Sequence, residues 1–109
     1  MVKDLISKKC EPCSGNTPKL SFEEISQYLS KLNEWTVNDN QEMIFKKFKF
    51  NNFQKALHFT NKVGDLAEKE GHHRDISIGW GYCLVMVHTH AIKGLSINDF
   101  ILASKIDLL

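Results

Sequence analysis

Four of the five histidines of this chain lie between residues 68 and 90: His72, His73, His88 and His90. Histidine is the side chain whose ordinary pKa lies closest to neutral pH, and its neutral ring is also a common metal ligand. Histidines gathered in one short stretch therefore suit acid–base catalysis or metal binding. They also occur as hydrogen-bonded polar groups at an interface, so the sequence leaves three interpretations to compare.

A metal site would draw its ligands from these four histidines. Two histidines at alternate positions of one strand, such as His88 and His90, point to the same face and form a suitable pair of ligands. Two adjacent histidines, such as His72 and His73, are difficult to direct at one ion. A metal site is therefore the less favoured interpretation, and we predict no metal ligands.

Acid–base catalysis needs two groups that titrate near neutral pH on opposite sides of a substrate, and an unperturbed imidazole, with a pKa of about 6.5, meets that need. Glu68 precedes His72 by four residues. It falls in the last turn of a predicted helix, where a carboxylate opposes the helix dipole at a cost of about 0.3–1 kcal/mol. From there it can accept a hydrogen bond from His72 and fix the tautomer of that ring. A metal-free acid–base site is the interpretation that the residues favour.

Three segments with the apolar spacing of helices surround these histidines. The first begins at a capping box of S-x-x-E type and covers about residues 21–32. The second is capped by an asparagine at 51 or 52 and ends at Gly71, which suits a left-handed helix cap. The third covers about residues 96–106. The paired histidines therefore follow directly on the end of the second predicted helix.

Two predicted hairpins separate these helices. One covers residues 35–50 and turns at 38–40, and the other runs from Ile76 to His90 and turns near Gly81. The last strand has two unlike faces, one suited to a core and one carrying histidines: Cys83, Val85, Val87 and Thr89 against Leu84, Met86, His88 and His90. The order αββαββα predicts an α+β fold, a four-stranded and mainly antiparallel sheet with three helices on one face.

The sheet face away from the helices would expose apolar side chains. Leu84 and Met86 lie on that face beside the histidines, and exposed apolar patches usually mark an interface or a ligand site. We therefore expect a partner subunit or a ligand pocket to cover it. A homodimer or a homotetramer is the expected assembly.

The length of 109 residues is that of one domain. We predict a leader with little regular structure over residues 1–20 and a single domain over residues 21–109. A net charge of +1 gives no field that would attract nucleic acid. The chain has no run of about 20 apolar residues and no signal-type segment, which predicts a cytoplasmic protein without membrane contact. Cys10 and Cys13 lack a second pair of the same spacing, so we expect no structural zinc site.

A set of spaced residues resembles the motif of the pterin-4a-carbinolamine dehydratase family: Glu68, His72, His73, Trp80, His90 and Asp99. The flanking stretches CEPCSGNTPKLS and GLSINDFILASKID are similar to that family's entry into its first helix and to its closing helix. The resemblance implies a hydro-lyase that removes water from a 4a-hydroxytetrahydropterin, the product of an aromatic amino acid hydroxylase, and gives quinonoid dihydropterin. This step belongs to the recycling of tetrahydrobiopterin-type cofactors and needs no metal or other cofactor.

The resemblance also implies roles for single residues. His72 and His90 would form the acid–base pair, and His73 would hold the substrate and contribute to proton transfer. Glu68 would orient and polarise His72. Two short stretches would bind the pterin: Gly71-His72-His73 and His88-Thr89-His90.

Some residues depart from the family pattern or have a simpler explanation. Arg74 stands where the family usually has proline, so the backbone is less restricted there. We expect Asp99 to act as a helix cap and Trp80 to pack in the structure. The alternative function is that of a binding module, because some members of the family are dimerisation partners of transcription factors. Only an enzyme would lose its function on substitution of His72 or His90.

Overall fold

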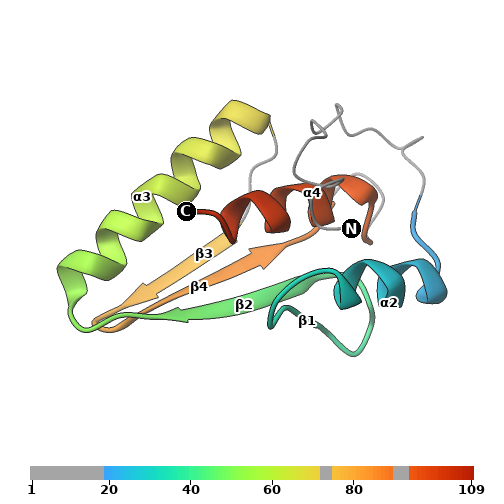
Figure 1. Cartoon of the computed structure of the whole chain (residues 1–109), viewed down its shortest axis with the longest axis horizontal. Helices are drawn as coiled ribbons and strands as arrows, with labels where there is room; N and C mark the ends of the chain where they lie inside the picture. Colours follow the sequence, from blue (N-terminus) through green and yellow to red (C-terminus); the bar gives the residue numbers. More distant parts are fainter. Residues whose placement is uncertain (1–18, 72–74, 90–93) are drawn as a thin grey trace.

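The computed structural model of the chain describes residues 19–71, 75–89 and 94–109 (Figure 1). Their helices and strands follow the order α2 (Phe22–Ser30), β1 (Thr36–Val37), β2 (Ile44–Lys49), α3 (Phe53–Glu70), β3 (Asp75–Gly79), β4 (Tyr82–Val87) and α4 (Ile97–Ile106). The predicted order αββαββα is therefore confirmed. Of the predicted leader, only Lys19 and Leu20 belong to the described residues.

The ends of α3 match the predicted caps. The Asn52 side chain accepts a hydrogen bond from the backbone N–H of Lys55 at 2.8 Å, which satisfies a donor that the helix start leaves without a helical partner. Gly71 has a φ of 67°, and its N–H donates to the Glu68 carbonyl at 3.1 Å. Glycine adopts this left-handed conformation at little cost, and the chain turns out of the helix there.

The strands form one sheet in the order β1-β2-β4-β3, and each neighbouring pair is antiparallel. β4 lies in the interior of the sheet, between β2 and β3. Val87 pairs with Ile44 of β2, and Val85 pairs with Ile76 of β3. This register brings the end of β4 beside the start of β3.

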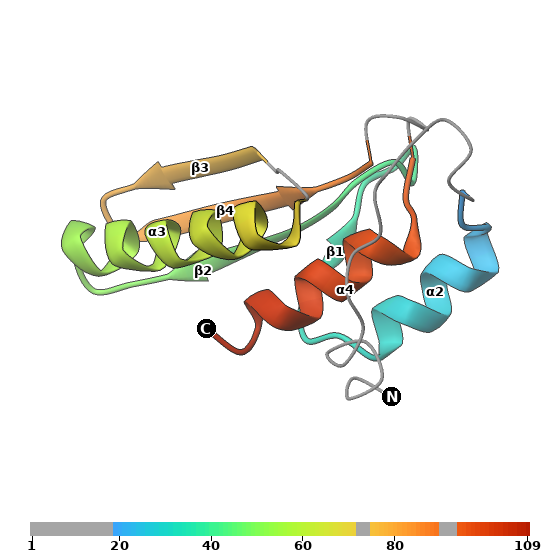
Figure 2. The ribbon, with the colours of Figure 1, turned by 90° about the horizontal axis from the view of Figure 1, so that it is seen from above.

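One hydrophobic core lies between the sheet and the helices (Figure 2). The sheet contributes Ile44, Cys83, Val85 and Val87. The helices contribute Ile25 from α2, Phe59 and Val63 from α3, and Phe100 and Ile106 from α4. A single core shared by the three helices and the sheet confirms the predicted α+β architecture.

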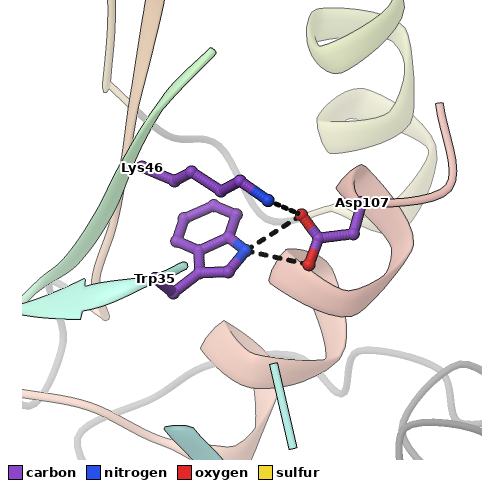
Figure 3. A network of polar contacts seen from close by, with 3 residues as sticks. All are labelled: Trp35, Lys46 and Asp107. Atoms are coloured by element: carbon purple, nitrogen blue, oxygen red, sulfur yellow. Dashed lines mark hydrogen bonds and ion pairs between the residues drawn. The ribbon is translucent and has the colours of Figure 1, made fainter. Parts of the chain in front are cut away.

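A largely buried polar contact joins the end of α4 to β2 and to the residue before β1 (Figure 3). The Lys46 ammonium lies 2.8 Å from Asp107 Oδ1, and the indole N–H of Trp35 donates to both carboxylate oxygens at 3.1 Å. The side chains of Lys46 and Asp107 are only 11% and 18% exposed. Each charge therefore depends on the other for its stabilisation.

The other face of the sheet carries Leu84 and Met86, which were predicted to be exposed and are half-buried in the structure. Leu84 and Met86 alternate along β4 with the buried Cys83 and Val85. Trp80, in the turn between β3 and β4, is 69% exposed. The expectation that this indole packs is wrong for the single chain, because its side chain extends from the turn into solvent.

Candidate active site

The structure describes part of the predicted site: Glu68, Gly71, His88 and Thr89. The other predicted residues lie outside the described residues: His72, His73 and His90, together with Arg74. The described residues directly flank both segments that carry the remaining histidines. They therefore define the positions of the residues on either side of each segment.

Both histidine segments join the sheet at the same end. Residues 72–74 lead into Asp75, the first residue of β3, and residues 90–93 follow shortly after the end of β4. Asp75 pairs with Met86 across the two antiparallel strands, so the start of β3 lies beside the end of β4 (Figure 2). The points from which the two segments depart are therefore close together.

The last turn of α3, which carries Glu68, is held against α4. Lys105 Nζ donates to Glu70 Oε1 at 2.6 Å, and these side chains are only 16% and 10% exposed. Glu68 lies on the exposed side of the same turn. The largely buried contact between Lys105 and Glu70 limits movement of the turn that carries Glu68.

A buried polar group holds the end of β4 from the core side. Thr89 Oγ1 donates to Asp99 Oδ2 at 2.7 Å and lies 3.0 Å from Ser96 Oγ. The Ser96 N–H donates to the same carboxylate oxygen at 2.9 Å. All three residues are at most 1% exposed. The residue directly before His90 is thus fixed to the first turn of α4.

Two backbone hydrogen bonds connect the residues on either side of the segment 90–93. The Thr89 N–H donates to the Gly94 carbonyl at 3.0 Å, and the Gly94 N–H donates to the Thr89 carbonyl at 3.4 Å. Beside this bridge, the Leu20 N–H donates to the Leu95 carbonyl at 2.8 Å. The aliphatic part of Lys19 lies against Gly94. Hydrogen bonds therefore hold together Thr89 and Gly94, the two residues that flank the segment carrying His90. Residues 19–20 lie beside this pair.

On the opposite face of the sheet, His88 contacts Asp75. Nε2 of His88 lies 3.2 Å from Oδ2 of Asp75, with the imidazole 19% exposed and the carboxylate 65% exposed. Asp75 was not among the predicted site residues. Its position directly after residues 72–74 was the available signal, but the contact with His88 depends on the strand register.

Cys83 is a packing residue on the core face of β4. Burial raises the pKa of its thiol above the ordinary value of 9.0, and a hydrogen bond from Thr60 Oγ1 at 3.2 Å lowers it by a smaller amount. The thiol is therefore protonated at neutral pH, and its chemistry is that of a small apolar side chain.

Within residues 19–71, 75–89 and 94–109, no group of three or more His, Cys, Asp or Glu side chains could hold a metal ion. His72, His73 and His90 are not among these residues, so the expectation of a metal-free site stays a prediction. Across the same ranges, none of the helices has the length and apolar character needed to cross a bilayer.

Comparison with known proteins identifies the family. A family model described as pterin 4 alpha carbinolamine dehydratase matches residues 18–109. The chain belongs to this family. A relative from Methylococcus capsulatus (strain Bath) is 49% identical over 103 residues, which cover 94% of this chain and 90% of the relative. A relative from Rickettsia bellii is 51% identical over 106 residues, which cover 96% and 93%. Both relatives carry the name pterin-4-alpha-carbinolamine dehydratase, and in both the name is marked as provisional.

Solved structures agree with this family assignment. A transcriptional coactivator/pterin dehydratase from Brucella melitensis has a TM-score of 0.79 at 28% identity, covering 84% of this chain and 97% of that one. A pterin dehydratase-like protein described as a RuBisCO assembly factor in the alpha-carboxysome has a TM-score of 0.60 at 21% identity, covering 70% and 88%. The second likeness shows the fold alone. The resemblance and the fold class predicted from the sequence are both confirmed.

Asp99 is one of the residues that resemble the motif of the pterin-4a-carbinolamine dehydratase family. It is fully buried and belongs to the described residues. Asp99 caps α4, as predicted, through its contact with the Ser96 N–H. It also accepts a hydrogen bond from the Thr89 hydroxyl, a contact that was not predicted from the sequence. The available signal was that Thr89 continues the core face of β4, where a hydroxyl requires a partner.

Proposed function

We propose that this member of the pterin-4a-carbinolamine dehydratase family is a hydro-lyase that converts a 4a-hydroxytetrahydropterin into quinonoid dihydropterin and water. The observation that carries the proposal is the antiparallel pairing of β3 with β4, which brings residues 75 and 89 to the same end of the sheet. The motif histidines belong to the two segments that leave from this end. A pterin bound there would be within reach of both segments.

The reaction suits two groups that exchange protons near neutral pH. The bond between C4a and the hydroxyl oxygen breaks, and the leaving hydroxyl takes a proton and becomes water. The neighbouring ring nitrogen uses its lone pair to form the C=N bond and then loses its own proton to a base. One acid and one base, each positioned beside the substrate, accelerate such steps by about 10²–10⁴-fold each.

The acid–base pair of this proposal is His72 with His90, which belong to different segments. His73 holds the substrate and contributes to proton transfer, and Glu68 orients and polarises His72. The place of Glu68 supports its role, because it lies on the exposed side of a helix turn that the Glu70–Lys105 contact holds.

The proposed pterin pocket is lined by Gly71, His72, His73, His88, Thr89 and His90. The hydrogen bonds of Thr89 within the protein limit which of its polar groups could bind the substrate. Its hydroxyl is bonded to Asp99 and its N–H to Gly94. Its carbonyl oxygen has a second lone pair and is the group left for a substrate donor.

The proposed mechanism needs no metal or other cofactor, because the pterin is the substrate and the acid and base are side chains. An aromatic amino acid hydroxylase would supply the carbinolamine in the cytoplasm, and the product would re-enter the recycling of a tetrahydrobiopterin-type cofactor. Membership of the family supports this setting.

A homodimer or a homotetramer is the assembly that we propose. The half-buried Leu84 and Met86 on the open face of the sheet support it, since a second subunit would remove this apolar surface from water.

The decay of a 4a-hydroxytetrahydropterin, generated in situ and followed by ultraviolet absorbance, tests the proposal. We expect the wild-type protein to accelerate the decay, and His72→Ala and His90→Ala to lower kcat by about 10²-fold or more. His58→Ala is the matched control, because His58 is an exposed histidine of α3, and it should keep the wild-type rate. A chelator should also leave the rate unchanged.

Two results would contradict the proposal. A folded wild-type protein without effect on the decay would exclude the dehydratase activity. A rate that falls with the chelator would exclude the metal-free mechanism.

A second candidate function is that of a binding module. The Brucella melitensis relative is named a transcriptional coactivator as well as a pterin dehydratase, and α3 exposes two apolar side chains one turn apart, Phe53 and Leu57. A pure binding role predicts that His72→Ala and His90→Ala change no function, so the same variants distinguish the two functions.

A further inference from the structure

The contact between His88 and Asp75 joins the two strands from which the histidine segments leave. Asp75 is the first residue of β3 and directly follows residues 72–74. His88 is the first residue after β4 and lies two residues before His90. The 3.2 Å contact between Nε2 and Oδ2 is therefore a side-chain connection between the starting points of both segments.

The contact is diagonal across the strand pair. Asp75 lies opposite Met86 in the register of β3 and β4. His88 is two residues further along the chain and on the same face as Met86. Diagonal positions are within reach of a long side chain, and the imidazole lies over the start of β3 with 19% of its surface exposed.

Contacts on both faces of the sheet hold the end of β4. Successive residues of an extended strand point to opposite faces, so Thr89 contacts Asp99 and Ser96 in the core while His88 contacts Asp75 on the open face. The contacts of Thr89 connect the strand end to α4. The contact of His88 connects it to β3, and so to residues 72–74.

We propose that Asp75 and His88 are positioning residues whose contact sets the separation of the two histidine segments. This inference rests on the proposed dehydratase function, in which the acid and the base come from different segments. A relative shift of the segments would change the distance between the two imidazoles at the substrate. Since a misplacement of about 1 Å can cost about 10²-fold in rate, loss of the contact lowers kcat more than it raises KM.

The test is a double-mutant cycle in the full chain, with kcat and KM measured for the dehydration. We expect Asp75→Ala to lower kcat by about 10-fold and to change KM by less than about 3-fold. His88→Ala also removes a residue of the proposed pocket, so it should lower kcat by at least as much and can also change KM; the KM criterion therefore applies to Asp75→Ala. In the His88→Ala background, Asp75→Ala should cost no further kcat, because the contact between Nε2 and Oδ2 is already absent. Asp75→Asn keeps an acceptor oxygen and should restore most of the lost kcat.

Two control variants separate positioning from general effects on the fold. Ser77→Ala changes an exposed residue of the same strand and face, and Asp39→Asn removes an exposed carboxylate in the turn before β2. Both should keep the wild-type kcat. The thermal unfolding midpoints of the positioning variants should match those of the controls. Asp75 is 65% exposed, so Asp75→Ala tests the inference even where His88→Ala does not fold.

The outcomes that overturn the inference are distinct from those that overturn the function. Unchanged kcat in Asp75→Ala, or losses that multiply in the double variant, would exclude the positioning role and leave the dehydratase proposal intact. A fall in kcat that only follows a fall in the unfolding midpoint would exclude it as well. A wild-type protein that does not accelerate the decay would overturn both.

Discussion

Thr89 belongs to both the core and the candidate site. Its hydroxyl lies in the core, bonded to Asp99 and next to Ser96, while the following residue is the proposed catalytic His90. A buried hydroxyl of this kind restricts the backbone, because any movement would separate polar atoms that water cannot reach. The core therefore fixes the end of the strand at Thr89, the residue directly before His90 in the sequence.

Substitution of Thr89 tests this connection. Thr89→Val keeps the shape but leaves the buried carboxylate of Asp99 with one donor fewer, so we expect a loss of about 1–3 kcal/mol in the free energy of unfolding and a lower kcat. Thr89→Ser keeps the hydroxyl and should retain most of the wild-type kcat, with about 1 kcal/mol lost for the missing methyl group. Urea unfolding and the dehydration assay measure both effects. Equal kcat in the two variants would contradict the role of the hydroxyl.

At the scale of elements, the site depends on where helices and strands end. α3 ends at Gly71, directly before the paired histidines, and the left-handed φ of 67° sets the direction in which the chain leaves the helix. The ends of elements could be predicted because caps depend on residues close in sequence, as Asn52 and Gly71 show. The contacts that hold these ends could not be predicted, because Thr89 with Asp99 and His88 with Asp75 depend on strand register and on packing.

Gly71 and Gly64 offer a matched pair of substitutions in α3. Among the described residues, and apart from the chain neighbours and the helix's own backbone, a Cβ would meet no atom within 4 Å at either position, whereas the backbone conformations differ. Gly71→Ala forces a left-handed conformation on alanine and should lower the free energy of unfolding by about 1–2 kcal/mol. Gly64→Ala lies inside the helix and should raise it by about 0.5–1 kcal/mol. Urea unfolding measures the difference, and changes of the same sign in both variants would contradict the assignment of Gly71 as the cap.

At the scale of the molecule, the two halves of the chain meet at the contact of Trp35, Lys46 and Asp107. Lys46 lies between Ile44 and Phe48 on the inward face of β2, where a lysine needs an opposite charge. The alternation of apolar residues and lysines along β2 predicted the strand. It could not show that Asp107 is the partner of Lys46, because Asp107 lies at the far end of the chain. The contact joins the first hairpin to the end of α4.

Removal of Asp107 should therefore destabilise the whole fold. Asp107→Ala leaves a largely buried ammonium without its carboxylate, and we expect the free energy of unfolding to fall by about 2–4 kcal/mol in urea. The neutral double variant Lys46→Met/Asp107→Asn should recover most of this loss, since asparagine still accepts the Trp35 N–H and no buried charge remains. Lys47→Met, on the exposed face of β2, is the control and should stay within about 0.5 kcal/mol of wild type. If the double variant were as unstable as Asp107→Ala, the loss would come from packing, and the buried charge of Lys46 would not be its cause.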